Sequence, residues 1–130
     1  MDRPLDAFSA MPAAGPLSER GAALVYLGDD RAALQSVLML QEFGLTVDVV
    51  NDASSALTWA THAHYSLLIC GGDFSHHLFA YRARLAAPQT QVLLMSRFPA
   101  RASLREAGVE LFPLPLQVNA LASKLAAIVG

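Results

Sequence analysis

The sequence has a single cysteine, Cys70, and therefore cannot form an intrachain disulfide. It also has no apolar run close to the roughly 20 residues that a helix needs to cross a bilayer. The amino terminus lacks the basic start and the apolar block of a secretory signal. Together these absences predict a cytoplasmic protein that does not contact a membrane.

Charge of either sign is also scarce. Lysine and arginine number 9 and aspartate and glutamate 11, which gives a net charge of -2. Such a chain has no positive field to attract a phosphate backbone, so direct binding of nucleic acid is not expected. The hydrophobic content of 54% over 130 residues suits one domain with a substantial core.

Residues 1–20 follow neither a strand period nor a helix period. They contain Pro4, Pro12 and Pro16, which interrupt regular structure. We predict a flexible N-terminal leader over 1–20 and a folded domain over 21–130.

Within that domain, short apolar runs alternate with helical patterns. Runs that are apolar at successive positions are typical of strands with helices on both faces. We predict strands at 22–27, 45–50, 65–70, 91–95 and 109–112, with the second nearer the sheet edge. Helices should follow each strand, the first capped by Asp29 or Asp30 and the third by Ser75. This order predicts a doubly wound α/β fold with a five-stranded parallel sheet.

Spacings of three and four residues predict three of these helices. The first is marked by Leu34, Val37, Leu38 and Gln41, and the third by Leu78, Phe79, Arg82 and Leu85. In the last helix, the side chains of Val118, Leu121, Leu125 and Ile128 are expected to face inward.

The central run from Tyr65 to Cys70 breaks at Gly71-Gly72. Open α/β sheets bind ligands and place reacting groups at the carboxyl ends of such strands. The first position after this strand is therefore a candidate functional position, and it is a glycine.

From about residue 22 to 129 the chain resembles the receiver domain of bacterial response regulators. The best block follows the family's spacing without a gap, from Gly44 through Val47, Val50, Ala53, Ala56 and Leu57 to Tyr65, Leu67, Leu68, Ile69 and Cys70. The resemblance implies a flavodoxin-like (βα)5 receiver fold. The intervals from Gly71 to Ser96 and from Ser96 to Leu114 are shorter than is usual in the family, so we expect shortened third and fourth helices.

The resemblance also assigns positions to the family's phosphorylation machinery. Gly71 stands where the family has the phosphoacceptor aspartate, and Leu114 where it has a lysine. Ser96 matches the switch hydroxyl, and the family's cis proline falls on Pro115, so the Leu114-Pro115 bond should be cis. A glycine cannot accept a phosphoryl group, and Asp73 is two residues too far along to replace it.

The family's Mg²⁺-binding acidic pair has two possible matches. An ungapped count places Leu27 and Gly28 there, whereas a shorter first helix would place Asp29 and Asp30 there. Two carboxylates alone hold Mg²⁺ poorly, so helix capping is the better reading of the aspartates, and no metal or other cofactor is expected.

Other chemical sites have weaker support. The histidines His62, His64, His76 and His77 lack the spacing of metal ligands and are expected to be solvated at helix ends. The turn at Gly71-Gly72 lacks the lysine of a phosphate-binding loop. No histidine is expected to reach Ser96, so a hydrolase is not favoured. Trp59 and Tyr81 are expected to pack within helices rather than bind a ligand.

These observations lead to a non-phosphorylatable pseudo-receiver that is not an enzyme. It would act by docking to a protein partner or to itself as a homodimer, and control an attached or partner output domain, such as a transcription regulator C-terminal to this chain. A modest basic surface for a partner could comprise Arg82, Arg84, Arg97, Arg101 and Arg105. The alternative is a small-ligand sensor that binds in the crevice lined by Gly28, Asp29, Gly71, Gly72 and Ser96.

Overall fold

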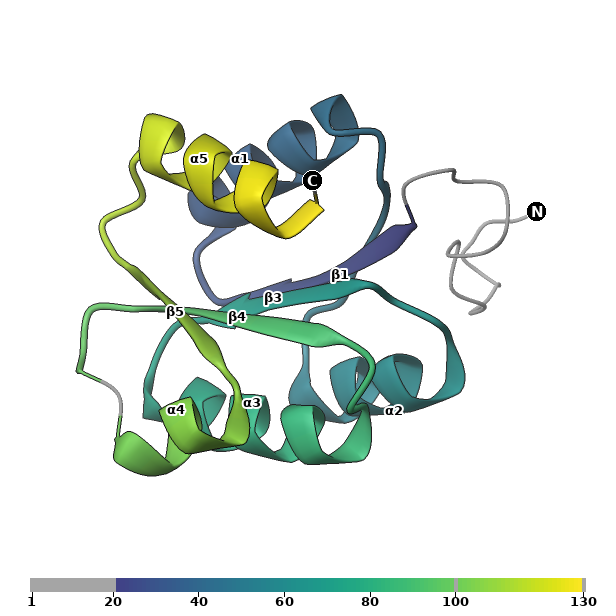
Figure 1. Ribbon diagram of the computed structural model, residues 1–130, viewed down its shortest axis with the longest axis vertical. Helices are drawn as coiled ribbons and strands as arrows, with labels where there is room; N and C mark the ends of the chain where they lie inside the picture. The colour runs from purple at the N-terminus through teal and green to yellow at the C-terminus, as the bar shows by residue number, and fades with distance from the viewer. Residues whose placement is uncertain (1–20, 100, 130) are drawn as a thin grey trace.

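A computed structural model describes residues 21–99 and 101–129, so the leader expected over 1–20 lies outside the described residues. Strands and helices alternate along the described chain (Figure 1). In order, the elements are β1 (Ala22–Leu27), α1 (Asp30–Glu42), β2 (Thr46–Val49), α2 (Ala53–His62), β3 (Leu67–Gly71), α3 (Phe74–Ala86), β4 (Gln91–Ser96), α4 (Ala102–Ala107), β5 (Glu110–Pro113) and α5 (Val118–Val129).

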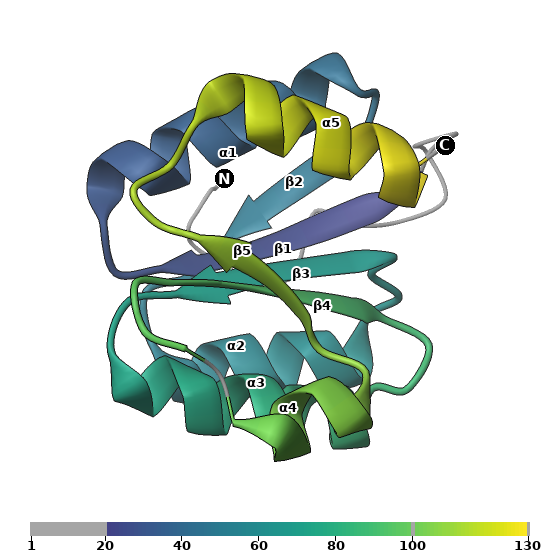
Figure 2. The ribbon, with the colours of Figure 1, turned by 60° about the vertical axis from the view of Figure 1, so that its left-hand side comes forward.

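The five strands form one parallel sheet in the order β2-β1-β3-β4-β5. Helices α1 and α5 cover one face, and α2, α3 and α4 cover the other (Figure 2). The predicted doubly wound α/β architecture is confirmed, with β2 at one edge. No helix among the described residues combines the length and the apolar character needed to cross a bilayer.

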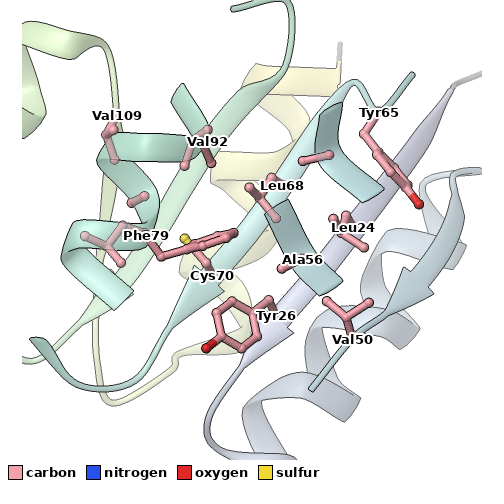
Figure 3. Packing of buried hydrophobic residues seen from close by; sticks show 14 of the residues in the cluster. Leu24, Tyr26, Val50, Ala56, Tyr65, Leu68, Cys70, Phe79, Val92 and Val109 are labelled. Carbon is pink, nitrogen blue, oxygen red and sulfur yellow. The ribbon is translucent and has the colours of Figure 1, made fainter. Parts of the chain in front are cut away.

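The sheet separates two apolar cores because successive side chains of a strand point to opposite faces. Leu24, Leu68 and Leu94 face α2, α3 and α4, in the core that Figure 3 shows around Cys70. Val25 and Ile69 face α1 and α5 on the other side. This two-sided burial explains why successive residues are apolar in the runs 22–27, 67–70 and 92–95.

Three aspartates cap the first three helices, and the third of them was not predicted as a cap. Asp29 caps α1 by accepting a hydrogen bond from the Arg31 amide, as capping by one of the two aspartates predicted. Asp52 caps α2. The prediction that Ser75 caps α3 is wrong, because Asp73 accepts the Ser75 amide hydrogen bond and so begins the helix earlier.

The inward face of α5 was predicted only in part. Leu121 and Leu125 are buried as expected, whereas Val118 is exposed. In α1 and α3, four of the large apolar residues that marked the helical spacing are also exposed, namely Leu34, Leu38, Leu78 and Leu85. Small residues take the sheet-facing positions instead and let the helix backbones approach the strands closely, namely Ala32 and Ser36 in α1 and Ala80 and Ala83 in α3.

The expected shortening is seen in one helix. Helix α4 has 6 residues. Helix α3 has 13 residues, as many as α1, so the prediction of a short third helix is not met. Its Asp73 cap starts α3 immediately after the β3 turn, which leaves little loop between the two elements.

Candidate functional site

The candidate site lies at the carboxyl ends of β1 and β3, the neighbouring strands at the centre of the sheet. From β1 the chain crosses through α1 to β2, and from β3 it crosses through α3 to β4, on the other side. The chain therefore diverges at this point, and such a switch point leaves the crevice in which open α/β sheets bind ligands.

Gly28 and Gly71 close the base of this crevice with their backbones. The Gly28 N–H donates to the Gly71 carbonyl over 2.9 Å. A Cβ added at Gly71 would overlap the backbone carbonyl oxygen of Met95 and lie 3.0 Å from the Met95 Cβ. Position 71 therefore lacks room for any side chain while β4 stays where it is.

The ring of His76 occupies the space above these glycines. It stacks on the Tyr26 ring with centroids 4.6 Å apart, and it is buried. Gly72 has a φ of 150°, and a Cβ there would lie 2.8 Å from His76 Cε1. The expectation that His76 is solvated is therefore wrong, because the first turn of α3 leans over the crevice and carries this ring into it.

Asp73 is the exposed N-cap of α3. Its carboxylate accepts a hydrogen bond from the Ser75 amide at 2.9 Å and also contacts the Ser75 hydroxyl and His76 Nδ1. The Ser75 hydroxyl, followed by His76, lowers the pKa of Asp73 to about 2. Asp73 thus stabilises the start of α3.

We expect Asp73→Asn to reveal this capping charge through pH. A carboxyl whose pKa falls from 3.8 to about 2 on folding stabilises the fold above its ordinary pKa and loses that stabilisation as pH falls through about 2. The stability gap between wild type and variant, measured by urea unfolding, should be constant above about pH 4.5 and shrink toward about pH 2.5. A gap that does not change over this range would show that the charge has no such role.

Ser96 at the end of β4 contacts a histidine, which corrects a second expectation. His77 Nε2 lies 2.8 Å from Ser96 Oγ, and the Phe98 amide donates to the same oxygen at 2.9 Å. Partial burial, followed by the nearby His76, lowers the pKa of His77 and so favours the neutral ring at pH 7. Sequence reasoning missed the pair because it joins residues 19 apart. The available signal was that α3 follows β3 and must pack beside β4.

This serine–histidine pair has a structural role. An activated serine nucleophile needs a base that a further group orients. The His77 ring has no carboxylate partner among the residues that the structure describes, and Ser96 Oγ already accepts the Phe98 amide. The contact therefore ties α3 to the segment after β4.

The acidic residues at the end of β1 point to solvent. Asp29 is engaged as the N-cap of α1, and Asp30 is exposed in the first turn. Within residues 21–99 and 101–129, no three His, Cys, Asp or Glu side chains converge as metal ligands. His62 and His64 are exposed, as predicted.

Leucines occupy two further candidate positions, 27 and 114. Leu27 and Leu114 are partly buried against the core under α1 and α5. The Leu114 amide donates to the Ser96 carbonyl over 3.1 Å, which brings the ends of β4 and β5 together. The Leu114-Pro115 bond is cis, as predicted.

Comparison with known proteins identifies the fold. No protein-family model matches the sequence, and no curated protein matches it. A response regulator from Thermotoga maritima aligns with a TM-score of 0.68 at 17% identity, covering 83% of this chain and 98% of its own. An orphan response regulator of H. pylori aligns with a TM-score of 0.71 at 16% identity, covering 84% of this chain and 97% of its own. The chain has the receiver fold.

A third solved structure with the receiver fold belongs to a family of streptococcal redox sensors described as having evolved from two-component response regulators. It aligns with a TM-score of 0.66 at 19% identity and covers 84% of this chain and 51% of its own. At these identities the likeness extends to the fold alone. The chemistry of this chain must therefore be argued from its own residues.

Proposed function

We propose that this protein is a non-phosphorylatable receiver-fold module of a bacterial signal-transduction regulator, active in the cytoplasm through protein docking. It controls an attached or partner output without a covalent switch and without catalysis. The observation that carries the proposal is the crowding at Gly71, where no side chain fits beside Met95. The receiver resemblance places the phosphoacceptor at this position.

The surroundings of Gly71 support the same proposal. A phosphoryl group and its Mg²⁺ need cationic and carboxylate partners. Leu27 and Leu114 supply apolar surface at two of the corresponding positions, and Asp29 is used as a helix cap. An open polar crevice would favour a small-ligand sensor, but the buried His76 ring fills this space.

The test is incubation of the protein with Mg²⁺ and a small phosphoryl donor, followed by intact-mass measurement. We expect no species heavier by about 80 Da, the mass of one phosphoryl group. A receiver domain with an aspartate at the end of its third strand serves as the positive control in the same tube. A hydroxylamine-labile adduct on this chain, mapped to any aspartate, would overturn the proposal because it would show an acyl phosphate.

A further inference from the structure

Helix α3 carries a stripe of large apolar residues on its outer surface. Phe74, Leu78, Tyr81 and Leu85 are 63%, 55%, 37% and 61% exposed. Their spacings of four, three and four residues place them on one side of a helix with about 3.6 residues per turn. The buried residues of α3, such as Phe79 and Ala83, lie on the opposite side. The stripe, called the α3 face below, therefore points directly away from the sheet.

The α3 face continues beyond the helix and has basic flanks. Phe98 stacks on Phe74 with centroids 4.4 Å apart and is itself 42% exposed, so it extends the apolar surface at one end. Arg82 and Arg84 flank the stripe within α3, which has no acidic residue of its own. Arg101 lies just before α4 and Arg105 lies within it. Helix α4 packs beside α3.

Helix α1 carries a smaller apolar surface of opposite charge on the other side of the molecule. Leu34 and Leu38 are 60% and 54% exposed and lie one turn apart, opposite the buried Ala32, Ser36 and Leu40. Asp30 and Glu42 stand at the two ends of this helix, against the single cation Arg31. These two leucines and their acidic flanks form the α1 face. Figure 2 shows α1 and α3 on opposite sides of the sheet.

We propose that the docking partner of the α3 face is the α1 face of a second copy of this chain. Both surfaces project apolar side chains away from their own sheet, so the two helices can pack against each other without rearranging either domain. The acidic ends of α1 would meet the arginines of α3. Pairing α3 with a second α3 would give these arginines no acidic partner from that helix, because α3 contains no acidic residue.

This pairing is heterologous, because the two copies contribute different surfaces. Each copy keeps one free α1 face and one free α3 face, so association can continue from a dimer to longer assemblies. A helix-on-helix contact is smaller than a standard stable interface, and we therefore expect weak, concentration-dependent association. Self-docking of this kind rests on the proposed docking function and makes a second copy of the chain the docking partner.

The heterologous geometry can be tested by blocking one face at a time. Leu38→Asp disables the α1 face and leaves the α3 face, and Leu78→Asp does the reverse. In analytical ultracentrifugation from about 10 µM to about 1 mM, wild type should grow in average mass with concentration, while each variant should stay monomeric. An equimolar mixture of the two variants should form a 1:1 dimer and nothing larger, because only one compatible pair of faces remains.

Controls keep the outcomes decisive. Val49→Asp adds the same charge at an exposed apolar position on the edge strand, outside both faces, and should leave the wild-type assembly unchanged. Circular dichroism checks that every variant is folded. Self-association of Leu38→Asp alone would show a symmetric α3 contact, and a wild type that is monomeric throughout would exclude self-docking. Either result overturns the inference and leaves the phosphorylation test of the proposed function unaffected.

Discussion

Gly71→Asp is expected to destabilise the protein strongly and to leave it unphosphorylated. The substitution restores the carboxylate that the receiver resemblance places at this position. Its Cβ, however, would overlap the Met95 carbonyl, so β4 would have to separate from β3 in the centre of the sheet. Overpacking of a buried site costs about 3 kcal/mol, and an added buried carboxylate increases that cost.

Urea unfolding of three variants separates crowding from charge. Gly71→Ala adds only the Cβ and should already show a loss of about 2 to 3 kcal/mol. Gly28→Ala is the matched control in the same crevice, since a Cβ there meets nothing nearer than 3.7 Å. It should cost less than about 1 kcal/mol. A Gly71→Asp protein of wild-type stability that accepts a phosphoryl group would show that the crevice is intact and lacks only the carboxylate.

The second large effect is expected at Gly72, which faces the His76 ring. Its φ of 150° is strained for any other residue, and an added Cβ would come within 3.0 Å of His76 Nδ1. Gly72→Ala should therefore cost about 3 kcal/mol, part from backbone strain and part from the clash with the ring.

A double-mutant cycle with His76→Ala measures how much of the destabilisation by Gly72→Ala comes from the clash with the His76 ring. Removing the ring abolishes the clash and leaves the strain, so the double variant should be more stable than the sum of the single effects by at least about 1 kcal/mol. Chemical denaturation of all four proteins measures this coupling. Additive effects would mean that the His76 ring does not sit over Gly72, and the filled crevice would lose its main support.

The sheet could be predicted from the sequence because its signals are local. The runs ending at Leu27, Cys70 and Met95 are apolar at successive positions, which is typical of strands covered on both faces. The break at Gly71-Gly72 located the end of the central strand to within a residue. Right-handed crossovers between parallel strands then predicted helices on both faces of the sheet, but not the strand order.

Helix orientation was harder to predict because apolar residues occur on two sides of α1 and α3. The spacing of Leu34, Leu38, Leu78 and Leu85 marked the two helices without showing which side packs on the sheet. Close packing on the sheet selects smaller residues such as Ala32 and Ala83. The exposed leucines are therefore not a failure of periodicity. They form a second apolar surface on each helix, and that surface supports the proposed self-docking.

The contacts of the candidate site could not be predicted from the sequence. The receiver resemblance assigned Gly71 and Leu114 to the positions where that family has a carboxylate and a lysine, and these two assignments remain predictions. The lack of space at Gly71 depends on Met95, a residue of another strand. The positions of His76 and His77 likewise depend on how α3 leans across β1 and β4, which no local pattern encodes.

The backbone of Gly28 and Gly71 and the His76 ring close the crevice between β1 and β3. The most direct test is an NMR titration of the 15N-labelled protein with Mg²⁺ and beryllium fluoride, a stable analogue of a phosphoryl group on a carboxylate. We predict that the amide resonances of Gly28, Gly71 and Ser96 do not shift. Saturable shifts confined to these three amides would show that the crevice admits a cation and a phosphoryl analogue, and would contradict the account.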